Sequence, residues 1–520
     1  MMKKARISAI STGKTFLRRS IGIPLALLLL LGGTACKTEP TTEPVVTTAT
    51  SMNTTSSVEE TAITTSETKK YPDDLPDNID LQKTTIRIAS RTNKRYANEF
   101  SVDALTGEIV NDALYMRNAR VEERLNCTIQ NDQISGSDDN HGPVLNGLET
   151  QLLAGDCEYD VIAGSMYWSM VHASNGYYLD LMQYLDIIDI EKPYWSTKFI
   201  EQAMINNKLY TLTGDAALTT RQSAFMMVFN KELADVHQMG DLYELVRSGK
   251  WTIDKLLELT ANVYQDLNND GVRGAEDMYG YSVSNRVGAD QWVNALDIKF
   301  FQKDADGKLK ICLDQDKFFS AYDKVYKLYY ENGGTYAYPY KGGDLEMEEI
   351  MNCFANDQLI FATNWLRGLE YQSIRNMDNK FGVLPSPKYD EAQSDYYTFM
   401  HDQLTVLSIP LTVSADRAEG VVAPFLEAFA AESHQSVIPQ YYEVALKCKL
   451  VDAPEDAEML DIISEGIYVD FVWMCRSSDQ YLKQVLRDGI MNKYSSVTAL
   501  LNAKIKAAEK SMSKFTALFE

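Results

Sequence analysis

From residue 84 onward, the hydrophobic pattern alternates between short segments with a period of two and longer segments with a helical period. Residues 85–89 (TIRIA) alternate in polarity, which predicts a β-strand. Residues 108–126 predict a helix, because Val110, Leu114, Val121 and Leu125 share one helical face. The same reasoning predicts further strands and helices at 127–130, 144–153, 159–164, 224–229 and after the N-cap Thr252. Repeated strand–helix–strand units predict an α/β fold with parallel sheets and right-handed crossovers.

The beginning of the chain has the pattern of an export signal. A basic leader precedes an apolar run at 21–31, which is too short to cross a bilayer of about 30 Å as a lone helix. The small residues 32–35 then lead to Cys36 in an arrangement that resembles a bacterial lipobox, although Gly33 stands where leucine is usual. We therefore predict a lipoprotein signal peptide at 1–35, a palmitate-type lipid on Cys36, and a location on the extracellular face of the membrane. The alternative is a plain secretory signal with a bystander cysteine.

The segment that follows Cys36 is dominated by Thr, Ser, Glu and Pro as far as residue 70. Such a segment cannot bury enough apolar surface to offset the entropy of ordering it, so we predict a flexible tether at 36–79. The whole chain of 520 residues has a formal charge of -23, which repels phosphate backbones and anionic headgroups. This charge argues against a nucleic-acid partner and against membrane contact other than through the lipid.

The cysteines other than Cys36 show no CxxC or CxxH spacing and are scattered along the chain. An even number in an exported protein permits disulfides, but the density is far below that of a disulfide scaffold. We therefore favour buried free thiols over bridges at Cys127, Cys157, Cys312, Cys353, Cys448 and Cys475.

Five segments in a fixed order resemble one family, the periplasmic-type solute-binding proteins of carbohydrate transporters, which include maltose-binding protein. The segments are 159–165 (YDVIAGS), 176–181 (GYYLDL), 206–210 with 229–233 (NNKLY, FNKEL), 354–365 (FANDQLIFATNW) and 381–387 (FGVLPSP). Asn207 and Asp357 stand where that family usually has glycine. The phrases at 107–113 and 121–126 resemble a branch typical of Gram-positive anaerobes.

The resemblance implies a two-lobed periplasmic-binding-protein-like fold (type II), with discontinuous lobes, a hinge and the ligand in between. It predicts lobe one at 80–218 plus 381–434, and lobe two at 219–380 plus 435–520. It also implies a monomer that delivers a small polar ligand, such as a sugar or oligosaccharide, to the permease of an ABC transporter. A surface adhesin or sensor with the same fold is an alternative.

Candidate ligand-binding residues follow from the rule that doubly wound sheets bind ligands beyond the carboxyl ends of their strands. Sugar hydroxyls need planar hydrogen-bonding groups, and the apolar face of a sugar needs an aromatic ring. Each candidate also has a structural alternative, such as a core position for Trp365 or a turn cap for Asp215. The candidates are Arg91, Glu99, Tyr167, Trp168, Asp215, Trp292, Asn364 and Trp365.

Residues 266–277 (DLNNDGVRGAED) match an EF-hand-like calcium loop. Oxygen side chains stand at its first, third, fifth and twelfth positions, and glycine at its sixth. The predicted calcium ligands are Asp266, Asn268, Asp270, the carbonyl of Val272, and Asp277. Asp277 departs from the pattern, because a longer Glu is usual at the twelfth position. We predict a structural calcium ion, with a metal-free Asp/Asn turn as the alternative.

No pattern of an enzyme is present in the sequence. The five histidines form no HExxH motif, and we find no GxSxG elbow, P-loop or Rossmann fingerprint. These absences favour a binding protein without a catalytic cofactor. A carboxylate-dependent glycoside hydrolase stays open, because Asp and Glu are abundant.

Overall fold

The computed structural model describes residues 71–92, 98–134, 142–305, 307–342, 345–447, 453–474 and 482–516. The predicted signal peptide, Cys36 and most of the predicted tether lie outside these residues. Among the residues that are described, no helix combines the length and the hydrophobicity needed to cross a membrane.

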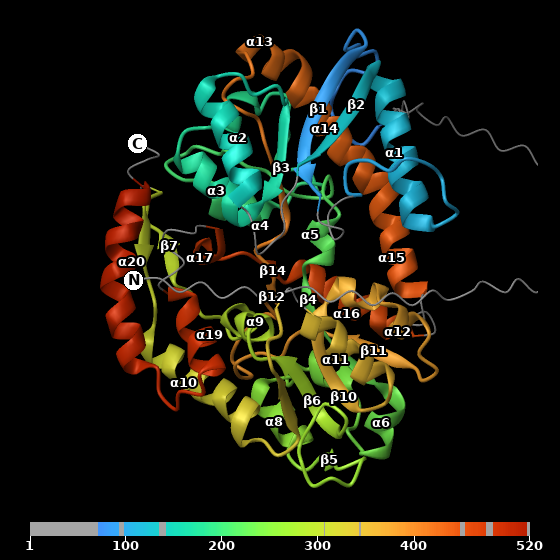
Figure 1. Cartoon of the computed structure of the whole chain (residues 1–520), viewed down its shortest axis with the longest axis vertical. Coiled ribbons are helices and arrows are strands. Elements are labelled where there is room, and N and C mark those ends of the chain that lie inside the picture. Colours follow the sequence, from blue (N-terminus) through green and yellow to red (C-terminus); the bar gives the residue numbers. More distant parts are fainter. Residues whose placement is uncertain are drawn as a thin grey trace, which may run out of the picture. The chain divides into compact units, whose positions relative to one another are not determined.

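The first sheet has four strands in the order β13-β3-β1-β2 (Figure 1). β1 pairs in parallel with β2 and with β3, whereas β13 pairs antiparallel with β3. Ile86 and Ile88 of β1 are buried, which confirms the strand predicted from their alternation. The strands of this sheet are β1 (Thr84–Arg91), β2 (Cys127–Ile134), β3 (Val161–Ser165) and β13 (Thr405–Ser408).

The helix α1 beside this sheet confirms the predicted helical face. It buries Leu114, Val121 and Leu125, and it ends at Asn126, which takes the left-handed conformation (φ 49°) directly before β2. The helical segments connected to the first sheet are α1 (Ile109–Leu125), α2 (Gly142–Ala154), α3 (Met166–Ser174), η1 (Leu181–Tyr184), α4 (Thr197–Ala203), α13 (Ala415–Arg417), η4 (Ala418–Val422) and α14 (Ala423–Glu432).

The second sheet has the order β11-β4-β10-β6-β5, and β9 pairs with β6 (Figure 1). β4 is antiparallel to both of its neighbours, whereas β10, β6 and β9 run in parallel. Every residue of β4 and β10 is buried, which explains their continuous apolar runs. The strands are β4 (Phe225–Asn230), β5 (Tyr264–Gln265), β6 (Met278–Ser284), β9 (Thr335–Tyr338), β10 (Leu359–Trp365) and β11 (Phe381–Leu384), and β7 (Phe301–Lys303) and β8 (Leu309–Ile311) form a separate hairpin.

Helices surround the second sheet, and one of them confirms a predicted cap. The Thr252 hydroxyl accepts a hydrogen bond from the Lys255 N–H (3.2 Å) at the start of α8. The helices of this part are α6 (Lys231–Val236), α7 (Leu242–Arg247), α8 (Ile253–Thr260), α9 (Val287–Ala295), α10 (Gln315–Tyr326), η2 (Lys327–Glu331), α11 (Leu345–Ala355), η3 (Leu366–Glu370) and α12 (Gln372–Arg375). Further along the chain lie η5 (Ser433–Val437), α15 (Ile438–Lys447), α16 (Pro454–Glu465), α17 (Phe471–Met474), α19 (Gln484–Met491) and α20 (Thr498–Thr516).

Three segments of the described chain connect the two sheets. The chain reaches β4 through α5 (Thr219–Gln222), returns to β13 through β12 (Thr398–Phe399), and leaves again through α15. β12 pairs in parallel with β14 (Ile467–Tyr468), which ties the second connection to the third. Residues 381–384, assigned to lobe one by the predicted boundaries, form β11 and pair with β4. The chain therefore returns to the first sheet later than predicted, and the other lobe limits stay a prediction.

Two turns explain the departures from glycine noted in the sequence. Asn207 (φ 59°) and Asp357 (φ 58°) both adopt the left-handed conformation. Asn and Asp tolerate this region better than other residues with a side chain, so the turns that favour glycine in the family are kept here at modest cost.

Candidate functional site

Residues 401–405, which follow β12 and end at the first residue of β13, contact side chains from both sheets; we call them the 401–405 segment. Arg91, at the end of β1, donates hydrogen bonds to the Gln403 carbonyl (2.9 Å) and to the Thr405 hydroxyl (2.7 Å). The Glu99 carboxylate accepts from the same Thr405 hydroxyl (2.6 Å), and from the N–H (2.7 Å) and hydroxyl (2.5 Å) of Thr219 in α5. The structure thus brings Arg91 and Glu99 together, and their bonds hold two of the connecting segments.

Tyr167 and Trp168 approach the 401–405 segment from the first sheet. They open α3 directly after β3, both side chains are half-buried, and their rings meet edge to face at 5.4 Å. The Tyr167 N–H donates to the Asp402 carbonyl (3.4 Å). A strand that ends at this point therefore places two aromatic side chains against the connection between the sheets.

Trp365 approaches the same segment from the second sheet. It is the last residue of β10, and its ring lies edge to face with the rings of His401 (5.5 Å) and Phe225 (6.1 Å). Only 3% of its surface is exposed. Trp365 therefore combines a core position with contact to the segment that Tyr167 contacts from the other side.

Two largely buried ion pairs lie near the 401–405 segment, and the sequence analysis did not predict either of them. Lys483 Nζ lies 3.1 Å from Asp402 Oδ2, and Arg487 Nε donates to Asp290 Oδ1 (2.8 Å). Burial alone would raise the pKa of Asp402, but the charges of Lys483, His401 and Arg487 lower it below its usual range. No local motif marks these residues, because their partners are distant in the sequence.

The other predicted ligand-binding residues lie apart from the 401–405 segment. The Asp215 carboxylate is bound by Arg221 Nε (2.9 Å) and His434 Nδ1 (2.6 Å), beside a separate cavity of 170 Å³. The Asn364 amide donates to the Met347 carbonyl (2.8 Å) and is fully buried. Trp292 is also fully buried, and its indole N–H donates to the Tyr329 hydroxyl (3.3 Å). All three side chains therefore have hydrogen-bond partners within the protein, and their role in ligand binding stays a prediction.

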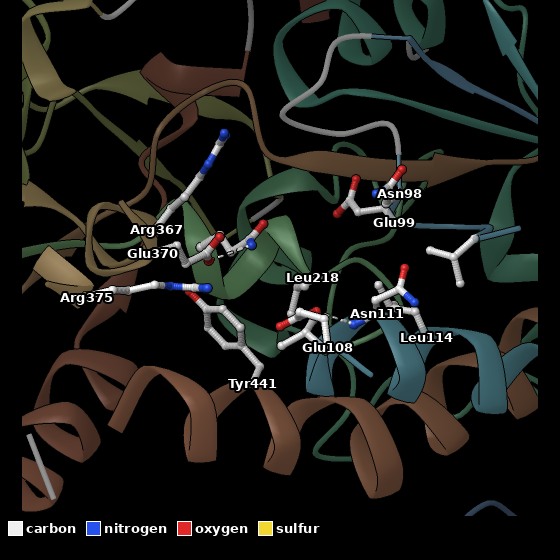
Figure 2. A pocket seen from close by; sticks show the side chains of 13 residues that line it. Asn98, Glu99, Glu108, Asn111, Leu114, Leu218, Arg367, Glu370, Arg375 and Tyr441 are labelled. Atoms are coloured by element: carbon white, nitrogen blue, oxygen red, sulfur yellow. Dashed lines mark hydrogen bonds between the residues drawn. The ribbon is translucent and has the colours of Figure 1, made fainter. Parts of the chain in front are cut away.

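A cavity of 230 Å³ lies between elements of the two sheets, and we call it the interlobe cavity (Figure 2). Glu99 is the one predicted residue that lines it. No sequence pattern marked the other lining residues, because they come from the segment before α1 and from α1, α5, η3, α12 and α15, which are far apart along the chain. The polar side chains that line it are Asn98, Glu99, Glu108, Asn111, Gln222, Arg367, Glu370, Arg375 and Tyr441.

Glu370 occupies the middle of this group. Burial raises the pKa of its carboxyl, although hydrogen bonds from Gln222 and Tyr441 and the charges of Arg367 and Arg375 oppose the shift. Gln222 Nε2 donates to Glu370 Oε1 at 2.8 Å. The cavity therefore combines neutral hydrogen-bond donors, two guanidinium groups and a carboxyl group, a set that suits a polar ligand.

In the predicted calcium loop, the carboxylates accept hydrogen bonds from backbone N–H groups of the same loop. Asp266 accepts from the Asn269 N–H (2.7 Å) and the Gly271 N–H (2.9 Å), and Asp270 accepts from the Val272 N–H (2.7 Å). Asp277 is buried and accepts from the Gly274 N–H (3.1 Å). No cluster of three or more His, Cys, Asp or Glu side chains within metal-binding reach occurs among the described residues. Carboxylates are suitable calcium ligands, but those of this loop do not converge on one point. The calcium ion therefore stays a prediction.

Four of the cysteines lie among the described residues, and none of these four forms a disulfide. Cys127 and Cys157 are buried, whereas Cys312 and Cys353 are half-buried. The expected buried free thiols are therefore confirmed at Cys127 and Cys157, whereas Cys312 and Cys353 are free but not fully buried. Cys36, Cys448 and Cys475 fall outside the described residues.

No protein-family model matches the sequence, and no curated protein is significantly similar to it. Solved structures do match. UgpB of Mycobacterium tuberculosis, in complex with glycerophosphocholine, has a TM-score of 0.57 at 14% identity over 83% of this chain and 99% of its own. An ABC substrate-binding protein of Listeria monocytogenes with cycloalternan has a TM-score of 0.51 at 14% identity, over 83% and 99%. An ABC transporter solute-binding protein of Thermotoga lettingae with α-D-tagatose has a TM-score of 0.50 at 13% identity, over 83% and 99%.

These likenesses establish the fold. The chain has the two-lobed α/β fold (type II) of ABC transporter solute-binding proteins, as the order of its sequence segments predicted. The first sheet belongs to one lobe and the second sheet to the other, so the 401–405 segment and the interlobe cavity lie where the lobes meet.

Proposed function

We propose that the protein is an extracellular solute-binding protein that captures a sugar or oligosaccharide for an ABC importer. The observation that carries this proposal is the meeting of side chains from both lobes at the 401–405 segment. Tyr167 comes from the first lobe, Trp365 from the second, and Asp402 lies on the segment itself. A ligand held at this point touches both lobes, so its binding stabilises the closed arrangement.

The chemistry of these side chains supports a saccharide. Aromatic rings such as Tyr167 and Trp168 stack on the apolar face of a sugar, while carboxylates and guanidinium groups pair with its hydroxyls. The neighbours of known structure were solved with cycloalternan, tagatose and glycerophosphocholine, which are all small polar molecules. They are binding proteins, which supports a role without turnover.

The lipid anchor and the permease partner are further parts of this proposal. The export signal and Cys36 support an anchored protein on the outer face of the membrane, and the fold supports delivery to a permease. The negative charge of the chain fits a membrane attachment through lipid rather than through a basic surface.

The first test is a thermal-shift screen of the purified protein against oligosaccharides. A ligand at about 100 times its dissociation constant adds about 2.7 kcal/mol of stability, which is readily measured. Small-angle scattering should then show a more compact particle with ligand, and chromatography should recover the ligand unchanged. Hydrolysis of the oligosaccharide would instead establish the glycoside hydrolase alternative.

A further inference from the structure

The interlobe cavity contains two buried guanidinium donor atoms with no hydrogen-bond partner, Arg367 Nη1 and Arg375 Nε, whereas the Tyr441 hydroxyl lies within hydrogen-bonding reach of the Glu370 carboxylate. Tyr441 itself is 2% exposed. Figure 2 shows the Arg375 side chain running toward the tip of the Tyr441 ring beside Glu370, with Arg367 on the other side of Glu370. Burying a donor without a partner is unfavourable, so two such donors at one cavity need an explanation.

The acidic side chains that line the cavity already have donors of their own. Glu99 accepts from Thr219 and Thr405, and the Glu108 carboxylate accepts from the Asn111 N–H (2.7 Å) at the start of α1. Glu370 accepts from Gln222. The carboxylates that line the cavity therefore already accept hydrogen bonds from the protein, whereas some guanidinium donors have no acceptor.

Other cationic side chains near the contact between the lobes form ion pairs, unlike Arg367 and Arg375. Lys483 pairs with Asp402 (3.1 Å), and Arg221 pairs with Asp215 (2.8 Å). Both guanidinium groups of the cavity lie close enough to Glu370 to lower the pKa of its carboxyl, but they form no ion pair with it among the described residues. The local protein thus leaves their charge available to a further group.

We propose that the interlobe cavity binds an anionic oxygen group of the transported ligand, a carboxylate or a phosphate, through Arg367 and Arg375. This inference rests on the proposed function, and it narrows the ligand to an acidic saccharide. The oxygen atoms of an anionic group accept hydrogen bonds, so such a group matches the two unpaired guanidinium donors. Charge-assisted bonds from guanidinium groups are the strongest that the chain offers such a group. The volume of 230 Å³ leaves room for that part of a ligand only.

The test compares acidic and neutral saccharides on the purified protein by isothermal titration. The probes are short oligogalacturonates, galacto-oligosaccharides of the same length, glucose 6-phosphate and inorganic phosphate. We expect an acidic saccharide to bind on the order of tenfold or more tightly than its neutral counterpart. Glucose 6-phosphate and the oligogalacturonates distinguish a phosphate from a carboxylate as the preferred group.

Substitutions of Arg375 test whether the cavity causes the preference for acidic over neutral saccharides. Arg375→Gln should remove the preference for the acidic saccharide, and Arg375→Lys should restore part of it. Arg247→Gln, which removes an exposed pair with Glu458 on another surface, is the matched control and should leave binding unchanged. The melting temperature of each variant without ligand shows that it has folded.

Each outcome decides between the two proposals. Binding of neutral but not acidic saccharides overturns this inference and leaves the proposed function intact, as does an acidic preference that persists in Arg375→Gln. Inorganic phosphate that binds as tightly as any acidic saccharide shows a site for a free ion, which also overturns it. If no saccharide of either kind binds, the proposed function itself is wrong.

Discussion

Lys483 Nζ lies 3.1 Å from Asp402 Oδ2 and 4.6 Å above the ring of Tyr167. The two side chains of the ion pair are 3% and 16% exposed. Lys483 directly precedes α19, which packs on α9 in the second lobe, whereas Tyr167 lies in the first turn of α3 in the first lobe. The pair therefore joins the lobes through the segment that connects them.

Removal of Lys483 should destabilise the protein strongly. Lys483→Met leaves Asp402 buried without its closest cation, and we expect a loss of about 3–5 kcal/mol in the free energy of unfolding, measured by denaturant titration. The double variant with Asp402→Asn should recover much of this loss. Lys310→Met is the control, because its pair with Asp304 has a 63% exposed lysine and should contribute less than about 1 kcal/mol. Strictly additive losses in the double variant would contradict the coupling.

Trp365 should report on both stability and binding. Its ring is 3% exposed and contacts Phe225 and His401, so Trp365→Ala should lower the free energy of unfolding by about 3–5 kcal/mol. It should also weaken saccharide binding about tenfold, because the ring supports the 401–405 segment. Trp251→Ala is the control: Trp251 is fully buried and packs on Phe361, away from that segment. An equal loss of affinity in both variants would remove Trp365 from the site.

Glu427 should make the stability of the first lobe depend on pH. Burial raises the pKa of its carboxyl to about 7, although hydrogen bonds from Tyr194 and Trp195 oppose the shift. Because the folded pKa is raised, the contribution is complete below about pH 4.5 and is lost as pH rises through about 7. As pH rises from 5 to 8, the free energy of unfolding of Glu427→Gln should therefore increase relative to that of the wild type, by on the order of 3 kcal/mol. If the free energy of unfolding changes with pH in the same way in both proteins, the pKa of Glu427 is not raised.

Calcium should raise the melting temperature through the loop at 266–277. Asp270 is exposed and bonds only within the loop, so Asp270→Ala should remove the effect of a chelator without disturbing the core. Asp277→Ala is a poorer probe, because Asp277 is buried and holds the Gly274 N–H. Asp316→Ala, an exposed carboxylate in the first turn of α10, is the control. Identical melting curves with calcium and with chelator would remove the metal from the account.

The lipid anchor is tested through Cys36, the single proposed attachment point. Cys36→Ser should release the exported protein from the membrane fraction into the medium, measured by fractionation and immunoblotting. A Cys36→Ser protein that is exported and yet stays with the membrane would show that the anchor lies elsewhere.

The sequence by itself determined the local elements and the fold. The alternation at 85–89, the helical face with Leu114 and Val121, and the Thr252 cap all appear where the pattern predicted them. Such features depend on interactions within a few residues, and the order of the five family-like segments then specified the topology. The same reasoning placed Arg91, Tyr167 and Trp365 at strand ends, where the fold brings them together.

Only the tertiary structure decided which of these side chains are accessible and which partners they have. Trp292 and Asn364 are fully buried, and Trp365 is only 3% exposed and meets the 401–405 segment through its ring contact with His401. The pairing of Asp402 with Lys483 joins residues 81 positions apart, and the donors of the interlobe cavity come from three different helices. A polar side chain carries no local mark of a partner that lies far along the chain, because that contact forms only when the two lobes pack on their connecting segments.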